Sequence, residues 1–423
     1  MGFFVIICFV ILFALGFPVV IALAAPSILY LVLNGFSLEM LTQRFQYSIF
    51  SFTLIAVPVF IFVGNLMNTS GITKRIFAFA DTAVGRLPGG LAQVNALASL
   101  IFSGMSGAAL ADIGGLGQMI IKSMKEKGFT PSFSAAVTCA TATVGPIFPP
   151  SIPLVVYASV ANVSLVRLLI GGIIPAILAV ILMMILIAVL ALFKNYPRAE
   201  RWPTLKEFFD TLLPALPALL APIIMVAGML IGIFTPTESA SITVLYIVLI
   251  NIFIYREFSI KHLISAAFKT IKLTGSVLII FPAAALFNWV LTVEQIPQLF
   301  STTVLSFTTD PYVMLLIVNI MLLIVGMFIG GNEAILLIVP IILKPLMMLG
   351  IDPIHLGIVV VFNLMLGLIT PPFALSLFLT ADIAKVKVNK VVRDVVPFYI
   401  PLLITLAIIT YLPKLILWLP NLF

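Results

Sequence analysis

The stretch GPIFPP, residues 145–150, returns as GLITPP at residues 367–372, an offset of 222 residues. Proline has no N–H to donate and clashes with the preceding helical turn, so each stretch should break a helix. In hydrocarbon an unpaired backbone group costs several kcal/mol, so a break is tolerated where it lines a cavity. A simple proline kink is the alternative for one copy alone. Two copies at one offset, each preceded by a glycine-rich turn, favour a binding site.

The composition predicts an all-α polytopic membrane protein. Of 423 residues, 62% are hydrophobic and 9% are charged, with a mean hydropathy of +1.29, whereas soluble domains are about 25% charged. Solid apolar runs are unlike the short alternating segments of a β-barrel. They occupy residues 2–33, 49–67, 132–193, 211–254, 273–293, 311–343, 354–380 and 395–419. The net charge of +7 is read as the cytoplasmic excess of Lys and Arg, not as nucleic-acid binding.

The offset of 222 also relates other glycines, prolines and lysines, which indicates an internal repeat. The pairs include Gly104 with Gly326, Lys122 with Lys344, Gly128 with Gly350, Pro131 with Pro353 and Pro175 with Pro397. Because glycine and proline dominate, the halves should share backbone shape more than side chains. We expect a first repeat over residues 1–195, a polar cytoplasmic connector over 196–209 and a second repeat over 210–423.

The loop charges predict that the two halves are inverted. Lys and Arg flank residues 91–121 on both sides, so this segment should be a re-entrant hairpin with its turn in SGMSG, residues 103–107. The equivalent segment, about 311–348, lies between Asp310 and Asp352 and should enter from the other side. Two hairpins and two broken helices, at 145–151 and 367–373, are typical of secondary transporters with a midplane site.

At these residues the chain resembles a known family. GMSGAALADIGGLG, GPIFPPSIPLVVYASVANVS, GIFTPTESA and GLITPP are similar to the large membrane subunit of tripartite ATP-independent periplasmic (TRAP) transporters, over essentially the whole chain. The resemblance implies sodium-driven import of a small organic acid by an elevator motion in the bacterial inner membrane. It also implies a small four-helix membrane subunit, expected here as a separate chain, and a periplasmic substrate-binding protein.

Sodium, the expected coupling ion, needs five or six oxygens, which broken helices supply as carbonyls at their C-terminal ends. One ion is expected between each hairpin turn and its break, in agreement with the paired sodium sites that the resemblance implies. The candidate sodium ligands are Ser103, Ser106, Gly145, Phe148 and Pro149 in the first repeat, and Gly326, Gly367, Thr370 and Phe373 in the second.

The carboxylate of the substrate should meet hydroxyl and N–H groups at helix starts. Ser106 and Ser151 are the candidates, with a bond back to their own helix as the alternative for each. Asn332, at the second hairpin turn, would contact a substrate hydroxyl or amide, or is simply a turn residue. Ser106 lies in the first hairpin turn and Ser151 directly follows Pro150, and both positions are expected to be helix starts.

Three acids fall inside apolar segments, where a charge is costly and usually functional. Glu238 and Glu333 are interpreted mainly as caps of helix N-termini, with an ion or substrate role as the alternative. Asp112 either pairs across the site or sits in a polar seam, and the sequence leaves both open. Arg167 is expected to be an anchor near the periplasmic edge.

Two other classes were weighed against the transporter. An intramembrane serine protease would use Ser106 in GMSG with a histidine base, but His262 and His355, the two histidines of the chain, both lie near expected membrane surfaces. A channel would need a continuous pore, whereas hairpins of opposite entry suggest alternating access.

The substrate and the accessory helices are less defined. GGNEA favours sialic acid over a C4-dicarboxylate, because it looks more like the second hairpin of that branch of the family. Residues 36–47, 204–209 and 258–270 are expected to be short interfacial arms that brace a scaffold. Residues 2–33 fit either one long helix or two short ones around Pro18.

Overall fold

A computed structural model describes residues 1–37, 39–50, 52–69, 71–194, 196–199 and 201–422, and every regular element among them is helical. The first half contains α1 Gly2–Ala14, α2 Val19–Leu33, α3 Glu39–Ile49, α4 Ala56–Thr69, α5 Ile72–Val84, α6 Leu91–Ser106, α7 Ala109–Asp112, α8 Gln118–Glu126, α9 Pro131–Thr141, α10 Ile152–Ala161, α11 Leu165–Gly171 and α12 Ile173–Lys194.

The second half has a similar succession of helices, and its first helix is longer than that of the first half. It contains α13 Leu205–Leu230, α14 Pro236–Leu249, α15 Ile260–Leu278, α16 Ile280–Val293, α17 Ile296–Phe307, α18 Pro311–Phe328, α19 Gly331–Met348, α20 Pro353–Gly367, α21 Leu375–Ala384, α22 Val388–Val395, α23 Tyr399–Tyr411 and α24 Pro413–Leu417.

Seven helical segments in the described part of the chain are long and apolar enough to cross a membrane, or eight if the bent pair around residue 50 is one span. Their apolar faces are exposed because lipid is the solvent expected there. They are Leu165–Lys194, Leu205–Leu230, Pro236–Ile254, Ile260–Val293, Pro311–Phe328, Gly331–Met348 and Val388–Tyr411.

The two predicted breaks and the two predicted hairpins are confirmed. After α9 and one 3-10 turn, the backbone from Gly145 to Ser151 is irregular before α10 begins, and residues 368–374 separate α20 from α21 in the same way. Both Pro-Pro peptide bonds, Pro149–Pro150 and Pro371–Pro372, are cis. In the first hairpin α6 is followed by α7, a π-helical segment and α8, and in the second α18 is followed by α19.

The broken helices start alike in both halves. Pro131 and Pro353 each occupy the first helical turn, where the missing N–H is not needed. The preceding residue caps the helix: the Thr130 hydroxyl accepts from the N–H of Phe133, and the Asp352 carboxylate accepts from that of Ile354.

Buried amides then join each hairpin to its broken helix. Asn95 on α6 donates to the Thr138 hydroxyl of α9 at 2.7 Å. In the second half, Asn363 on α20 donates to the Asn319 side-chain oxygen of α18 at 2.7 Å. A buried amide is costly unless it is bonded, so these pairs fix how each hairpin sits on its helix.

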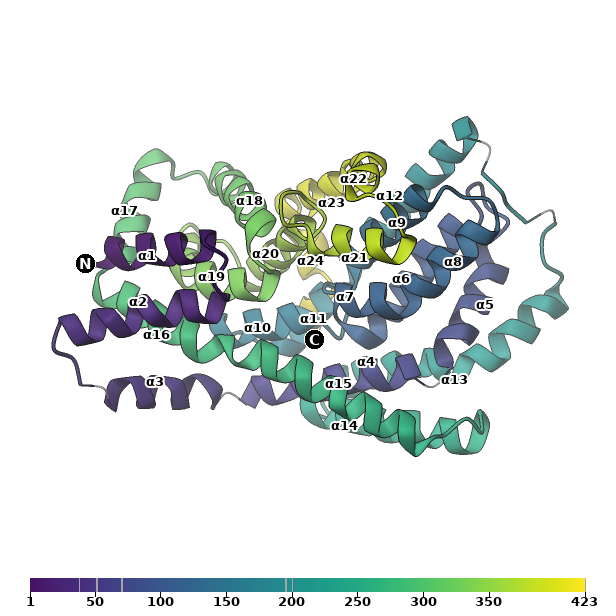
Figure 1. Ribbon diagram of the computed structural model, residues 1–423, viewed down its shortest axis with the longest axis horizontal. Helices are drawn as coiled ribbons and strands as arrows, with labels where there is room; N and C mark the ends of the chain where they lie inside the picture. Colours follow the sequence, from purple (N-terminus) through teal and green to yellow (C-terminus); the bar gives the residue numbers. More distant parts are fainter. Residues whose placement is uncertain (38, 51, 70, 195, 200, 423) are drawn as a thin grey trace.

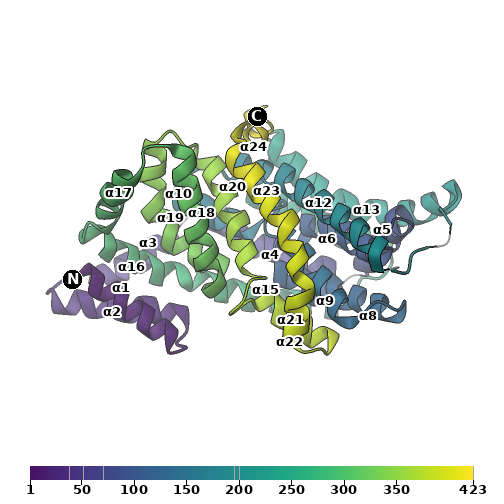
Figure 2. The ribbon, with the colours of Figure 1, turned by 90° about the horizontal axis from the view of Figure 1, so that it is seen from above.

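The halves also interlock. Helix α16 of the second half packs on α2 and α3 of the first, whereas α4 of the first half packs on α14 and α15 of the second. Figures 1 and 2 show α1 and α2 at one end of the long axis and the connector beyond α12 at the other. The hairpins and breaks lie between these ends.

The accessory segments differ in part from their predictions. Residues 2–33 form two helices, with Pro18 as the N-cap of the second. The arm predicted at 36–47 corresponds to α3, although residue 38 lies outside the described residues. The arms predicted at 204–209 and 258–270 are wrong as separate elements, because they are the first turns of the long helices α13 and α15.

Candidate functional site between the hairpins

A cavity of about 1260 Å³ lies where the two hairpin turns and the two breaks meet. One wall comes from these four elements: residues 107–111, 114, 115 and 119 of the first hairpin, Pro146, Ile152 and Pro153 at the first break, residues 330–333 of the second hairpin, and Met365, Leu368 and Leu375 around the second break. The opposite wall comes from α4, the start of α5 and α15. Residues more than 200 positions apart therefore share one site.

The first hairpin docks directly on the first break. Gly107 ends α6 with a φ of +63°, a conformation that favours glycine. A Cβ there would lie 2.4 Å from the Pro150 carbonyl oxygen. The Gly107 carbonyl in turn accepts from the N–H of Ile152 at 3.4 Å. Larger residues at this turn would separate the hairpin from the break.

Behind the Gly107 turn, a buried carboxylate meets two serines and the break. The Ser106 hydroxyl donates to Asp112 Oδ1, and Ser103 Oγ lies 3.5 Å from Asp112 Oδ2. A Cβ on Gly145 would lie 2.5 Å from the same Oδ2. Asp112 is only 2% exposed, and no described Lys or Arg is within ion-pair distance. Such a carboxylate is expensive to bury unless a cation compensates it.

These contacts place three of the predicted sodium ligands, Ser103, Ser106 and Gly145, around one point. Asp112 was not predicted as a ligand, and the structure places it across the hairpin turn from Ser106. The expectation that Ser106 lies at a helix start is wrong, because it is the last residue of α6. Its position puts it beside the carbonyls of a helix C-terminus, which attract cations.

The other two first-repeat candidates lie in the break itself. Pro149 is buried, and the half-buried Phe148 ring packs towards Gly104, whose Cβ would lie 3.2 Å from its Cε1. Ser151 is the N-cap of α10: its hydroxyl accepts from the N–H of Leu154 at 3.1 Å and donates to the Pro146 carbonyl. The Ser151 hydroxyl is thus already bonded within its own segment, and it does not line the cavity.

In the second half the backbones approach even more closely. A Cβ on Gly367 would lie 2.3 Å from the carbonyl carbon and oxygen of Gly326. The N–H of Phe373 donates to the Met327 carbonyl at 3.3 Å, and the Thr370 hydroxyl donates to the Leu366 carbonyl at 2.7 Å. The predicted residues of this half lie together at the ends of α18 and α20. Backbone carbonyl oxygens are the main groups there that could bind a cation.

The tip of the second hairpin faces the cavity. Asn332 lines it, and its buried Oδ1 has no hydrogen-bond partner in the described part of the chain. Glu333 folds back over the start of α19, because a Cβ on Gly330 would lie 2.3 Å from its Oε2. Glu238 does act as a cap, in a capping box with Thr235 at the start of α14.

The structure also places Arg167 and the two histidines. Arg167 donates to the Pro420 carbonyl and, at 2.6 Å, to Asn421 Oδ1, so it ties α11 to the C-terminal segment. His355 is buried in the first turn of α20 with its Nε2 2.8 Å from the Ile409 carbonyl oxygen, while His262 lines the cavity. The Ser106 hydroxyl is paired with Asp112, not with a histidine base.

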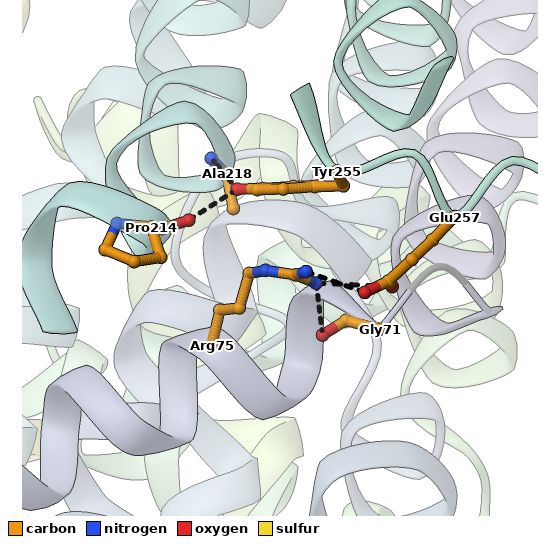
Figure 3. A network of polar contacts seen from close by, with 6 residues as sticks. All are labelled: Gly71, Arg75, Pro214, Ala218, Tyr255 and Glu257. Carbon is orange, nitrogen blue, oxygen red and sulfur yellow. Dashed lines mark hydrogen bonds and ion pairs between the residues drawn. The ribbon is translucent and has the colours of Figure 1, made fainter. Parts of the chain in front are cut away.

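A polar network holds the edge of the cavity beside Gly71 and Glu257 (Figure 3). Arg75 donates to both carboxylate oxygens of Glu257, at 2.6 and 3.2 Å, and stacks 4.0 Å from the Tyr255 ring centre. The hydrogen bond from Arg75 lowers the pKa of Glu257. The Tyr255 hydroxyl donates to the Pro214 carbonyl and accepts from the Ala218 N–H, a pair that would bond each other in a regular helix.

Comparison with known proteins gives this architecture a family. Residues 6–415 match the family model described as the tripartite ATP-independent periplasmic transporter, DctM component. The chain is 38% identical to the sialic acid TRAP transporter large permease SiaM of Vibrio cholerae, covering 96% of both chains. It is 35% identical to the sialic acid TRAP permease SiaT of Haemophilus influenzae, covering 99% of this chain and 68% of that protein.

Another relative is named for a different substrate, and one solved structure resembles this chain in fold alone. The C4-dicarboxylate TRAP large permease DctM of Pseudomonas aeruginosa is 38% identical, over 88% of this chain and 86% of that one. Among solved structures, the Alcanivorax borkumensis YdaH transporter has a TM-score of 0.61 at 16% identity, covering 88% of this chain and 86% of that one. The relatives are permeases, so the expectation of a transporter in place of an enzyme is confirmed.

Proposed function

This chain belongs to the DctM family of TRAP transporters, as a multi-pass large permease, and we propose that it couples the inward movement of sodium to import of a small organic acid. The observation that carries the proposal is the single cavity in which both hairpin turns and both breaks meet. Its volume of about 1260 Å³ accommodates a sugar acid or a dicarboxylate with water.

Two sodium sites would lie behind the hairpin turns. The first would use the Asp112 carboxylate, the hydroxyls of Ser103 and Ser106, and backbone oxygens near Gly145. The second would use backbone oxygens around Gly326 and Gly367, with Thr370. A sodium ion at the first site would compensate the buried carboxylate, which supports the coupling role of the ion.

Transport by an elevator motion follows from the same geometry. Each hairpin is bonded to its own broken helix through buried amides, whereas the opposite wall is built from helices that interlock between the halves. We therefore assign the hairpins and broken helices to the moving unit, and the interlocked helices to the scaffold. A small membrane subunit would extend the scaffold, and a periplasmic binding protein would deliver the acid.

Sialic acid is the first substrate to test. The relatives at 38% and 35% identity are named as sialic acid permeases, but the 38% relative from Pseudomonas is named for C4-dicarboxylates. Others are named for isethionate and 2,3-diketo-L-gulonate. What these substrates share is an acidic group on a small polar molecule, which is the class we propose.

Uptake into proteoliposomes tests the proposal. Vesicles containing this chain and its small subunit, with the binding protein outside, should take up N-acetylneuraminate or succinate when an inward sodium gradient is imposed. Ser106→Ala and Thr370→Ala should each reduce this uptake. Uptake that is the same with choline in place of sodium, or that proceeds without the binding protein, would refute the coupling or the tripartite mechanism respectively.

A further inference from the structure

Lysines line the wall of the cavity that faces the hairpins. Lys269 and Lys272 come from α15 and Lys74 from the start of α5. On α15 the cavity-lining positions are 262, 269, 272, 273 and 277, a spacing that places them along one side of a helix. The lysines are therefore part of a continuous helical face directed at the cavity.

The neighbouring side of α15 packs against α4, which lines the same cavity, and the far side carries the exposed Ile264, Phe268 and Ile271. Ala266 and Thr270 are buried on the side towards α4, and Asn65 Nδ2 donates to the Thr270 hydroxyl at 3.1 Å. This contact sets the rotation of the helix and leaves Lys269 and Lys272 at the edge of the cavity face, outside the contact with α4. Both side chains are exposed in the structure, and the surface they meet is the cavity.

Lys269 and Lys272 form no ion pair in the described part of the chain, whereas Lys74 lies close enough to Glu257 for a longer-range attraction. Among the described residues, none of the ion pairs involves Lys74, Lys269 or Lys272. Glu257, which lines the same cavity, is held by Arg75 instead. Lys269 and Lys272 lie in the more polar first part of the helical stretch Ile260–Val293, ahead of its apolar residues 273–293. Cations without an ion-pair partner that line a cavity attract anions to it.

We propose that Lys269 and Lys272, supported by Lys74, form an anion subsite that receives the carboxylate of the transported acid as it leaves the hairpin turns. The inference rests on the proposed function for the nature of the anion. The two walls are chemically different: the hairpin wall offers glycine backbone, Asn332 and the Glu333 carboxylate, and the wall of α15 and α5 carries the three lysines. A positive wall raises the local concentration of an anion and draws it away from the hairpins.

Cysteine modification tests the subsite without requiring transport. In Lys272→Cys, the remaining charge on Lys269 lies one turn away, about 6 Å. At that distance one charge in water changes the rate of a charged reagent about threefold. Each variant is described by the ratio of its modification rate with an anionic methanethiosulfonate to that with a cationic one. This ratio should be about tenfold higher in Lys272→Cys than in the double variant Lys272→Cys/Lys269→Gln. Lys272→Cys/Lys269→Arg should keep the preference.

Protection by ligand is the second readout. N-acetylneuraminate or succinate should slow modification of Lys272→Cys, and added salt should weaken the protection because it screens the charges. Lys122→Cys is the matched control, since Lys122 lies on α8 with its side chain exposed and does not line the cavity. It should show no protection. The unmodified chain gives the background, with Cys139 buried and Cys8 half-buried.

The outcomes separate this inference from the proposed function. Equal rates for both reagents, or no protection by either acid, in vesicles that still show sodium-driven uptake would overturn the subsite alone. Protection by anionic lipid vesicles but by neither acid would overturn it in favour of a lipid contact. Protection by the acids without sodium-driven uptake would support the subsite and count against sodium coupling.

Discussion

Gly367→Ala tests whether the close approach of α18 and α20 builds the second half of the site. The new Cβ would lie 2.3 Å from the carbonyl carbon and oxygen of Gly326 and 2.5 Å from its Cα. Carbon atoms in contact need roughly 3.5 Å, so one helix must move by about 1 Å. The atoms that are struck belong to the backbone and cannot turn aside. In a close-packed interior such overpacking costs about 3 kcal/mol.

The expected result is a lower melting temperature of the purified protein in lipid nanodiscs. A loss of about 3 kcal/mol corresponds to a fall of about 3 °C, because the entropy of unfolding grows with chain length. Measured in sodium and in choline, the variant should also lose the stabilisation that sodium gives, because the displaced backbone no longer presents its oxygens to the ion.

Gly275→Ala is the matched control. Gly275 lies in α15 with nothing within 4 Å of the added Cβ, so alanine should be neutral or stabilise by about 0.5–1 kcal/mol. If Gly367→Ala has the same melting temperature as the native protein and is stabilised by sodium to the same extent, the contact between α18 and α20 is not tight. The backbone of Gly326 and Gly367 would then not form the second site.

Three further substitutions probe single contacts. Asp112→Asn should abolish much of the rise in melting temperature caused by sodium, without lowering stability in choline, because the amide carries no buried charge; a full sodium response would refute Asp112 as a ligand. Asn332→Ala should leave the melting temperature unchanged, since its Oδ1 is unbonded, but raise the KM for the acid about tenfold; an unchanged KM would remove it from the substrate site. Glu257→Gln, which leaves Arg75 stacked on Tyr255, should cost about 1 kcal/mol at neutral pH, as the Glu257 side chain is 43% exposed. Because the folded pKa of Glu257 is lowered, this contribution is present above the ordinary value of 4.5 and lost as the pH falls through the folded value; a difference that persists in acid would contradict it.

The hairpins and breaks could be predicted from the sequence because glycine and proline act locally. The Pro-Pro pairs at 149–150 and 371–372 each remove two successive N–H donors, whereas single prolines such as Pro222 lie inside a continuous helix. The shared offset of 222 residues indicates that both breaks serve the same architecture. The two halves could be aligned for the same reason, since backbone shape survives when side chains differ.

The amphipathic segments were misread because one pattern fits two environments. A helix with polar residues on one side suits a membrane interface, but it also suits the wall of a cavity inside a span. Lys269 and Lys272 gave α15 this pattern, and the cavity is what they face. For α13, the capping box of Thr204 and Glu207 was the available signal that a long helix begins there.

The spacing of residues along the sequence could not predict that Asp112 bonds to Ser106. Ser106 and Asp112 are six residues apart, which on a continuous helix places them on different sides. They meet only because Gly107 takes a positive φ and turns the chain between them. A carboxylate in an apolar run signals a function, but its ligand geometry depends on a turn that the spacing does not reveal.

The two half-sites also differ in charge, although their backbones repeat. The residue 222 positions after Asp112 is Ala334, and the neighbouring acid, Glu333, folds back over the start of α19 instead of meeting the second break. The second half has Gly326 and Gly367 in backbone contact. The first site therefore attracts a cation by charge, while the second relies on how closely two helix ends approach. Asp112 and Ser106 belong to one hairpin and stay together when it moves, whereas paired carbonyls form a site only when α18 and α20 are together. The second site is consequently the one whose sodium affinity should depend on the position of its hairpin.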